Sequence, residues 1–283
     1  MKLSIITVNL NNLDGLKSTI DSVFRQIALD KVEFIIVDGL SSDGSQEFIM
    51  SSKSKISKIL IEKDEGVYDA MNKGAALATG EYLIYMNSGD TFFDENICGN
   101  FINELATEDI VYGDAYCQTE AGRTAIYDGN HNNIFTKMPF NHQAVFTKTE
   151  LQNNLKFKTE FQISGDYEFF LRAYKKGASF RKINLFVSRH KLDGISVSNP
   201  VRSCIESAFA LTSHYPAIDL RDTEYFAKIL VRELSCIGRN ERDKLLLFLE
   251  HAANPRRSLH GRAKNFFKAL YYLILVSFRP SQE

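Results

Sequence analysis

Continuous apolar runs alternate with amphipathic segments over the first 90 residues. Four of the runs predict strands, at Leu3–Val8, Val32–Val37, Ile56–Ile61 and Tyr82–Met86, and the first two are continuous enough to predict buried strands. Apolar residues at helical spacing between the runs predict helices near Leu16–Phe24, Gln46–Met50 and Tyr68–Ala78. Strands that alternate with helices favour βαβ units, and therefore an α/β fold built on a parallel sheet with right-handed crossovers.

The pattern is mixed in the middle of the chain and helical at its end. Ile110–Tyr116 and Ala144–Thr147 predict strands, and Asp166–Lys176 predicts a helix that Gly177 ends. From Val201 onward the pattern predicts helices, at Cys204–Leu211, Thr223–Ile237 and Asn240–Ala252. We therefore expect an α/β domain over residues 1–200 and a helical region over residues 201–283.

Composition and charge exclude several classes of protein. With 283 residues, 44% of them hydrophobic and 24% charged, the chain is an ordinary globular protein, and a net charge of -1 argues against nucleic-acid binding. Four cysteines without close spacing (Cys98, Cys117, Cys204 and Cys236) favour a reducing compartment. The longest apolar run, Ala269–Phe278, is too short to span a bilayer and no signal peptide is present, so we expect a soluble or peripheral protein.

Polar clusters follow three of the predicted strands directly. They are Thr7–Asn9, Asp38–Asp43 and Asn87–Asp90. Ligands of open parallel sheets bind beyond the carboxyl ends of the strands, so we expect these clusters to meet at one rim and form a binding site.

Single residues of these clusters allow two interpretations each. Asp38 can accept the ring N–H of a nucleobase or can cap a Gly- and Ser-rich turn. Asp69, Asn72 and Lys73 share one helical face. They either bind a ligand or belong to an amphipathic helix whose start is stabilised by the acidic residues that precede it. Asp90 is either a ligand for Mg²⁺ or Mn²⁺ or a turn residue.

Four motifs in order resemble a known family, the family 2 inverting glycosyltransferases of the GT-A fold. They are Thr7–Asn11, Val37–Ser45, Asp64–Gly74 and Asn87–Asp90, and the resemblance covers about Lys2–Ser198, particularly to bacterial enzymes of capsule, colanic-acid and O-antigen assembly. It implies a three-layer α/β/α domain with a mostly parallel central sheet, followed here by a C-terminal helical extension.

The resemblance also implies how a nucleotide-diphospho-sugar donor is held. Its candidate donor-binding residues are Thr7, Asn9, Asp38, Asp64, Asp69, Asn72, Lys73, Asn87 and Ser88. The implied metal, Mn²⁺ or Mg²⁺, falls on Asp90, because Asn87 and Gly89 stand where the family's Asp-x-Asp motif often has carboxylates. His190 either completes the metal shell or is a solvent-facing residue of a basic loop.

The catalytic base implied by the family lies at the start of a late helix. Ser164–Arg172 matches this signature, with Gly165 in place of the first acid and Asp166 as the base. An inverting transfer needs one carboxylate that deprotonates the acceptor hydroxyl; the alternative for Asp166 is a helix N-cap. Acceptor-side candidates are His142, Gln143 and Glu168, and a structural histidine at His142 would look the same in sequence.

Basic and apolar residues are interleaved without acids over residues 255–280. The basic residues are Arg256, Arg257, Arg262, Lys264, Lys268 and Arg279. This composition is typical of an interfacial helix on anionic lipid, and the alternative is a helix that docks on the core or forms a dimer. Membrane contact on the cytoplasmic face would suit an enzyme whose saccharide acceptor is lipid-linked.

The predicted function is that of an inverting hexosyl- or N-acetylhexosaminyl-transferase of surface polysaccharide synthesis. A UDP-sugar is the favoured donor and a GDP-sugar the alternative. A sugar nucleotidyltransferase would need a Gly-rich basic loop after the first strand, and Asn9–Gly15 is not one. A non-catalytic nucleotide-sugar-binding protein is the other alternative, since Gly165 replaces an acid and Asp90 lacks a partner carboxylate. Donor sugar, acceptor, linkage and oligomeric state stay open.

Overall fold

Two compact units make up the chain. The computed structural model describes residues 2–104, 106–118, 124–191 and 198–224. Residues 1–131 and 139–194 form the first unit, and residues 132–138 and 195–283 form the second. The second unit thus includes a short segment from the middle of the chain, which the hydrophobic pattern did not indicate. Cys236, the predicted helices beyond residue 224 and the basic tail lie outside the described residues.

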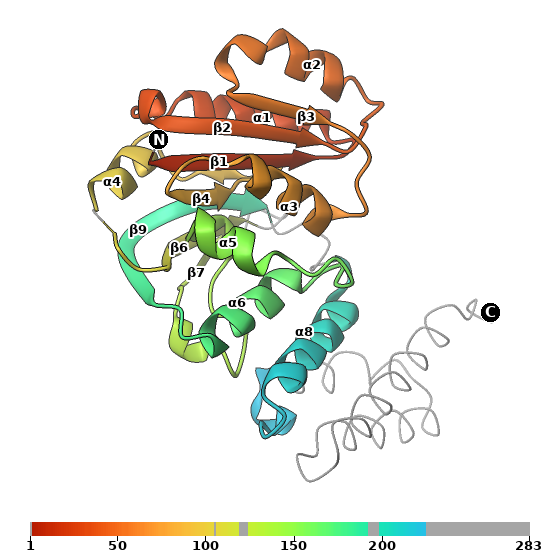
Figure 1. Ribbon diagram of the computed structural model, residues 1–283, viewed down its shortest axis with the longest axis vertical. Helices are drawn as coiled ribbons and strands as arrows, with labels where there is room; N and C mark the ends of the chain where they lie inside the picture. Colours follow the sequence, from red (N-terminus) through yellow and green to blue (C-terminus); the bar gives the residue numbers. More distant parts are fainter. Residues whose placement is uncertain (1, 105, 119–123, 192–197, 225–283) are drawn as a thin grey trace, which may run out of the picture. The chain divides into compact units, whose positions relative to one another are not determined.

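The parallel half of the sheet is built as predicted. Strands β1 (Leu3–Asn9), β2 (Val32–Asp38), β3 (Lys58–Ile61) and β4 (Tyr82–Tyr85) lie in the order β3-β2-β1-β4, all parallel. Figure 1 shows the helices that connect them, which are α1 (Leu13–Phe24), α2 (Ser45–Ser51) and α3 (Val67–Leu77). The three predicted βαβ connections are confirmed.

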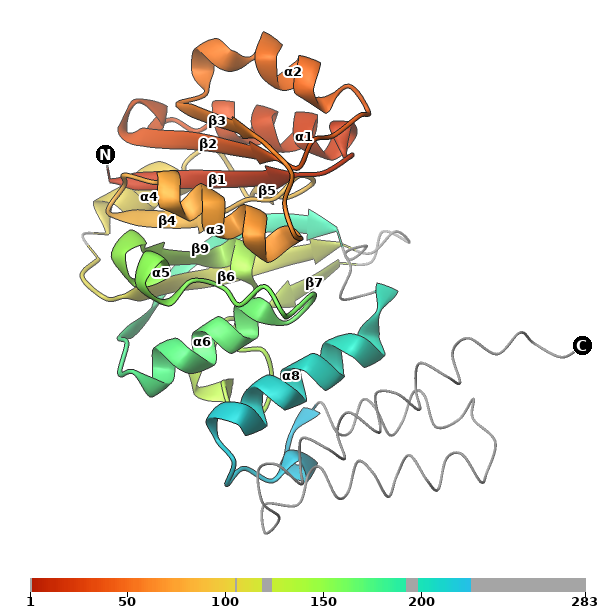
Figure 2. The same ribbon diagram turned by 45° about the vertical axis from the view of Figure 1, so that its right-hand side comes forward.

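The other half of the sheet is mixed. Strand β8 (Val145–Lys148) pairs antiparallel with both β4 and β6 (Ile110–Gln118), and β9 (Phe180–Lys191) runs parallel to β6. The short strands β5 (Thr91–Phe92) and β7 (Thr124–Tyr127) pair antiparallel with β9 and β6. Strand β9, seen beside β6 in Figure 2, was not predicted, although Ile183, Leu185 and Val187 are apolar at every second position.

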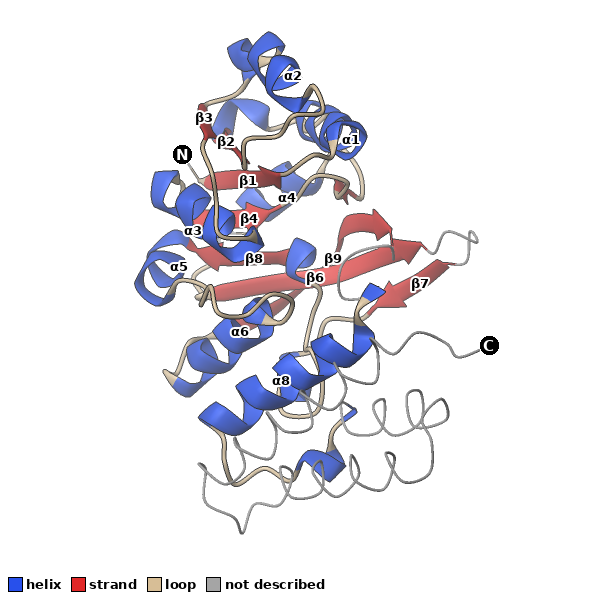
Figure 3. Ribbon diagram, turned by 90° about the vertical axis from the view of Figure 1, so that its right-hand side faces the viewer, coloured by secondary structure: helices blue, strands red, loops and turns tan. Residues whose placement is uncertain are grey.

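Helices cover both faces of the sheet in the first unit. On one face, β1 and β2 residues such as Leu3 and Phe34 pack with Leu16 of α1 in the main core. On the other face, Gly74 of α3 lies so close to Ile6 that a Cβ there would overlap its side chain. Figure 3 shows α1 and α2 on one side of the strands and α3 and α5 (Thr149–Leu155) on the other. This is the predicted three-layer arrangement.

Two further helices belong to the first unit. Helix α4 (Ile97–Asn103) contributes Ile97 and Phe101 to the core. Helix α6 (Gly165–Lys175) is followed by Gly177, whose φ of 82° lies in the left-handed region that suits glycine after a helix. The predicted helix at Asp166–Lys176 is therefore confirmed.

The second unit contains helix α8 (Pro200–His214), which confirms the predicted helix at Cys204–Leu211. Residues 132–138, which come from the middle of the chain, pack within this second unit. Phe135 meets Tyr215 edge to face, and the carbonyl of Thr136 accepts a hydrogen bond from the Glu224 amide. Among the helices that the structure describes, none has the length and apolar character to cross a membrane.

Candidate active site

The polar clusters after β1, β2 and β4 meet at one rim, as predicted. Asn9 Nδ2 donates to Asp38 Oδ2 at 2.8 Å. The amide of Ser88 donates to the carbonyl of Val8, and Thr7 Oγ1 donates to the carbonyl of Met86. The carboxyl ends of neighbouring strands are therefore joined by hydrogen bonds into one site.

Asp38 organises the loop that follows β2. Its carboxylate is completely buried and accepts from Asn9 Nδ2, from the Ser41 amide and from Ser41 Oγ, each at 2.8 Å. Asn9 is buried beside it, and its Oδ1 has no hydrogen-bond partner. Thr7 is completely buried too, so its direct role is to tie β1 to the end of β4. Donor contacts of these three residues stay predictions.

The rim carries backbone strain. Asn11 and Leu40 have positive φ angles of 49° and 64°, which are uncommon for residues other than glycine. Such strain persists where the surrounding structure holds it, often at binding sites.

Asp64 lies against the same loop, since a Cβ on Gly39 would overlap its Oδ2. Its Oδ1 accepts from the Gly66 amide at 2.9 Å.

Asp69 and Lys73 are held by an ion-pair cluster at the start of α3. Lys73 Nζ lies 3.0 Å from Asp69 Oδ2 and 2.9 Å from Glu62 Oε1. Asp69 Oδ2 also accepts from the Glu65 amide at 3.1 Å. Burial acts to raise the pKa of Asp69, but the Glu65 amide and Lys73 lower it below its ordinary value. The cluster holds residues 62–65 against the helix.

Asn72 has a structural explanation that the sequence did not suggest. Its Nδ2 donates to the carbonyl of Phe157 and its Oδ1 accepts from the Phe157 amide, both at 2.8 Å. The Asn72 side chain thereby satisfies the backbone amide and carbonyl of Phe157, in the irregular segment after α5. This pairing occupies the amide that we assigned to donor binding.

Thr19 of α1 shapes the loop Asn87–Asp90. Its hydroxyl donates to the carbonyls of Asn87 and Asp90 and accepts from the Gly89 amide. Asn87 Oδ1 and Ser88 Oγ are buried without a partner. The loop therefore contains two buried polar atoms without partners, in the segment where we predicted contacts with the donor.

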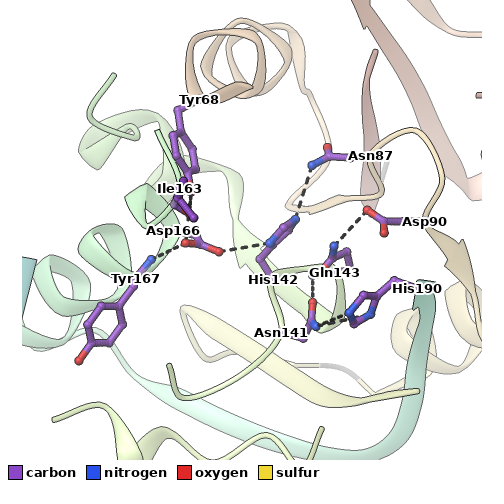
Figure 4. Close-up of polar contacts among 10 residues, drawn as sticks. All are labelled: Tyr68, Asn87, Asp90, Asn141, His142, Gln143, Ile163, Asp166, Tyr167 and His190. Atoms are coloured by element: carbon purple, nitrogen blue, oxygen red, sulfur yellow. Dashed lines mark hydrogen bonds and ion pairs between the residues drawn. The ribbon is translucent and has the colours of Figure 1, made fainter. Parts of the chain in front are cut away.

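Asp90 and His190 lie across from each other, although they are 100 residues apart in sequence. In the antiparallel β5–β9 pair, Thr91 is opposite Arg189, so the next step of the register brings Asp90 opposite His190. Gln143 Nε2 donates to Asp90 Oδ2 at 3.1 Å, and Asn141 Nδ2 lies 3.2 Å from His190 Nε2. Figure 4 shows this row of side chains.

One carboxylate and one imidazole fit a hard or borderline divalent cation that keeps further positions for other ligands. Over the described part of the chain, no group of three or more His, Cys, Asp or Glu side chains could hold a metal. Protein ligands alone would therefore form an incomplete shell, which phosphate oxygens and water could complete.

Asp166 lies at the start of α6, where Ser164 is the N-cap residue. The N-cap alternative for Asp166 is therefore wrong. Its Oδ1 accepts from the Tyr167 amide at 2.8 Å and lies 3.3 Å from the Tyr68 hydroxyl, which also donates to the carbonyl of Ile163 at 2.6 Å. Tyr68 belongs to the predicted donor motif on α3, so this motif also supports the base.

His142 contacts the other oxygen of the candidate base. Its Nδ1 lies 3.2 Å from Asp166 Oδ2, and its Nε2 lies 3.5 Å from Asn87 Nδ2 (Figure 4). Burial alone would lower the pKa of His142, but the hydrogen bond to Asp166 and the charges of Asp166 and Asp90 raise it above its ordinary value. The site thus brings together the acceptor-side, base and donor-loop predictions.

Glu168 lies away from the rim chemistry. Its side chain is completely buried, both oxygens accept from Arg172 Nε at 2.9 Å, and Lys158 Nζ lies 3.0 Å from Oε1. Arg172 also donates to the carbonyls of Leu155 and Lys156, so the network joins α6 to the end of α5. The geometry gives Glu168 a structural role and provides no support for the acceptor-side prediction.

The three-layer fold with its mostly parallel sheet is the GT-A fold. The profile of Glycosyl transferase family 2 matches residues 4–178, and the chain belongs to this family. It is therefore an enzyme that transfers sugars.

Curated relatives carry the same activity in their names. A PGL/p-HBAD biosynthesis glycosyltransferase of Mycobacterium tuberculosis is 30% identical over 183 residues, which covers 62% of this chain and 70% of the relative. An uncharacterized glycosyltransferase of the same organism is 30% identical over 178 residues, covering 60% of this chain and 68% of the relative.

Solved structures show the likeness in fold. The structure of Staphylococcus aureus TarS residues 1–349 with UDP-GlcNAc has a TM-score of 0.66 at 16% identity, covering 99% of this chain and 93% of that chain. The mannosyltransferase PcManGT of Pyrobaculum calidifontis, in complex with GDP-Man and Mn²⁺, has a TM-score of 0.56 at 17% identity, covering 99% and 76%.

Several residues of the site escaped prediction from sequence. Thr19, Tyr68 and Asn141 hold predicted residues in place through contacts between distant segments, and Ser41 does so within its own loop. Tyr68 and Ser41 had a usable signal, because they lie inside the Asp64–Gly74 and Val37–Ser45 motifs.

Proposed function

We propose that this enzyme transfers a hexose or N-acetylhexosamine, with inversion, from a nucleotide-diphosphate sugar to a hydroxyl of a saccharide acceptor. The observation that carries the proposal is the position of Asp166. A carboxylate with 14% of its side chain exposed lies at a helix start beside the donor-loop residue Asn87, with His142 between them.

The proposed reaction is a single displacement. Asp166 takes the proton of the acceptor hydroxyl, whose oxygen then attacks the anomeric carbon opposite the diphosphate. The new glycosidic C–O bond forms as the bond from the anomeric carbon to the diphosphate oxygen breaks, and the nucleoside diphosphate leaves with the electron pair. One face of the sugar must therefore meet Asp166 and the other the loop Asn87–Asp90.

Asp90 and His190 would hold a Mn²⁺ or Mg²⁺ ion in this scheme. When bound, such an ion neutralises charge that develops on the departing diphosphate. Gln143 orients Asp90, and Asn141 orients His190, through the contacts described above. Their amides therefore have supporting rather than ligating roles in the proposal.

Donor recognition is assigned to the loops after β1, β2 and β4. Asp64 would face the nucleobase, and Asp38, which is completely buried, would hold the loop around it. Asn9 and Asn87 each have a buried side-chain oxygen without a hydrogen-bond partner. We favour a UDP-sugar, in line with the UDP-GlcNAc bound by TarS, with a GDP-sugar as the alternative that the PcManGT complex represents.

A lipid-linked acceptor at the cytoplasmic face of the membrane completes the proposal, with a place in surface polysaccharide synthesis. Two observations support it: the basic, acid-free composition of residues 255–280, and the relative whose name places it in PGL/p-HBAD biosynthesis.

Replacement of the base tests the proposal directly. We expect Asp166→Asn to lower kcat for transfer by about 10²–10⁴-fold because it removes general-base catalysis, with little change in donor affinity. Product release would be measured over a panel of UDP- and GDP-sugars, and the anomeric configuration by NMR. Asp21→Asn, on the exposed part of α1, is the matched control; equal rates for wild type and Asp166→Asn would remove Asp166 from the mechanism.

Metal removal tests the second part of the site. We expect EDTA to abolish donor binding and Mn²⁺ to restore it. Asp90→Asn should raise the Mn²⁺ concentration for half-maximal binding at least about tenfold, because it removes a carboxylate ligand. Asp14→Asn, with its carboxylate 99% exposed, should not change it. Donor binding that is insensitive to EDTA would contradict the metal site.

A further inference from the structure

His142 bridges the candidate base and the donor loop. We propose that His142 is the positioning residue of the base: its Nδ1 holds Oδ2 of Asp166, Asn87 holds its other nitrogen, and only the uncharged imidazole leaves the base competent. This inference rests on the proposed role of Asp166 and gives a specific function to His142, which the sequence indicates only as an acceptor-side candidate.

The contacts of Asp166 leave its Oδ2 able to accept a proton. A carboxylate has about four lone-pair positions. The Tyr167 amide and the Tyr68 hydroxyl face Oδ1, and His142 Nδ1 faces Oδ2. Each oxygen can accept about two hydrogen bonds, so Oδ2 keeps a lone pair beside His142. The same imidazole that orients this oxygen also lies next to the atom that takes the acceptor's proton.

The contact with Asn87 is compatible with both charge states of His142. With Asn87 Nδ2 as the donor, Nε2 is unprotonated and the neutral ring carries its proton on Nδ1, directed at Asp166. The oxygen and nitrogen of an amide are assigned from such networks. Rotation of the amide brings Oδ1, which is buried without a partner, to face Nε2, where it can accept a proton from the imidazolium.

Charges around His142 favour its protonation. Asp166 contacts it from α6 and raises its pKa although burial opposes the charge. The charge of Asp90, in the loop after β4, adds to this effect only while no cation is bound there. Near α6, the titratable side chains of Tyr68 and Lys158 contact Asp166 and Glu168, respectively, rather than His142. As the pH falls, His142 becomes an imidazolium.

The charged and neutral forms of His142 would affect the base differently. An imidazolium forms a charge-assisted hydrogen bond with Asp166, which is stronger than the neutral one and reduces the tendency of Oδ2 to accept a proton. The neutral ring orients the carboxylate without this penalty. The acidic limb of the pH–rate profile should therefore report His142.

Two substitutions separate orientation from charge. Asn places an amide N–H where the imidazole has Nδ1, so His142→Asn keeps a donor to Asp166 but cannot titrate. His142→Ala removes the donor. His131→Asn is the matched control, because His131 lies in the same unit and contacts Tyr112 rather than Asp166.

The experiment is the pH dependence of kcat at one saturating Mn²⁺ concentration, with thermal midpoints recorded to confirm folding. One pH unit below the wild-type midpoint, we expect wild type and His131→Asn to lose about tenfold in kcat, as one titrating group requires. His142→Asn should lose less than about twofold at that pH, and His142→Ala should lose at least about tenfold at every pH because the base is no longer oriented.

An acidic limb that stays in place in His142→Asn would overturn the inference, as would wild-type kcat in His142→Ala. Asp166→Asn separates a failure of the proposed base from a failure of the role of His142. If Asp166→Asn is active, the proposed base fails and the inference with it. If it is inactive while the limb does not move in His142→Asn, only the role of His142 fails.

Discussion

Gly165 and Tyr68 show how one residue position depends on another far away. A Cβ at Gly165 would lie 2.7 Å from Tyr68 Cε2 and 2.9 Å from Cδ2, closer than real side chains approach. The tyrosine ring fills the volume that an acid would need at position 165, and its hydroxyl reaches Asp166. The loss of the family's first acid is thus matched by an aromatic support for the second.

A methyl group at position 165 should disturb both residues. We expect Gly165→Ala to shift either the Tyr68 ring or the start of α6, to destabilise the fold by about 1–3 kcal/mol, and to lower kcat because Asp166 moves. Thermal unfolding and initial rates would measure both effects.

Gly99→Ala in α4 is the control, because a Cβ there would make an ordinary 3.7 Å contact with Ala28 Cβ. It should leave stability and kcat nearly unchanged. Gly165→Ala with wild-type kcat would show that the close packing against Tyr68 is not needed to orient the base.

At the scale of elements, helix α3 is fixed at both ends by polar contacts. Asp69 and Lys73 hold its first turns. After its last residue, the amide of Thr79 donates to Glu33 Oε2 on β2 at 2.7 Å. Glu33 is buried and also accepts from Ser4 Oγ, and Lys58 Nζ of β3 lies 2.7 Å from its Oε1. This network joins three strands to α3 and so determines where Tyr68 lies.

The Glu33 network should make stability depend on pH. Burial acts to raise the pKa of Glu33, but Lys58, Ser4 and Thr79 lower it from 4.5 to about 2. A lowered folded-state pKa gives stability that is complete above pH 4.5 and is lost as the pH falls toward 2. This corresponds to on the order of 3 kcal/mol in the unfolding free energy.

Urea unfolding at pH 7 and pH 3 would test this. Glu33→Gln should unfold at lower urea at pH 7, and the difference from wild type should shrink at pH 3. Glu81→Gln is the control, since Glu81 forms an exposed pair with Lys2 at 3.5 Å that contributes little. An equal loss for Glu33→Gln at both pH values would mean that shape, rather than charge, explains the effect.

At the scale of the whole molecule, the C-terminal tail is our candidate for bringing the enzyme to its acceptor, which we propose is lipid-linked. The interleaved basic and apolar residues over 255–280 predict binding to anionic lipid surfaces. Deletion of residues 255–283 should abolish sedimentation with phosphatidylserine vesicles, while donor hydrolysis persists because the first unit carries the site.

Neutral vesicles provide the control, and high salt should weaken binding to the anionic ones because surface attraction is screened. Unchanged sedimentation of the truncated enzyme would contradict the membrane role and would favour the alternative of a docking or dimer-forming helix.

Local pattern was sufficient for much of the architecture. Period and propensity identified the strands β1 to β4, β6 and β8 and the helices α3 and α6, because a buried strand or an amphipathic helix must repeat its apolar residues along its own length. The rim followed from the same reasoning, since polar residues came directly after three parallel strands. The order of the four motifs then indicated the family before any contact was known.

Tertiary structure alone decided which side chains meet. Tyr68 and Asp166 are 98 positions apart, Asn72 and Phe157 are 85 apart, and His142 and Asp166 are 24 apart. Asn72 and Glu168 look like site residues in sequence and turn out to join segments in the structure, whereas Asp90 and His190 come together through strand register. Contacts between distant segments depend on how elements pack and pair, and no periodicity within one element records them. The sequence by itself thus determined the parallel half of the sheet and the chemistry available at the rim, and packing decided which residues hold Asp166 in place.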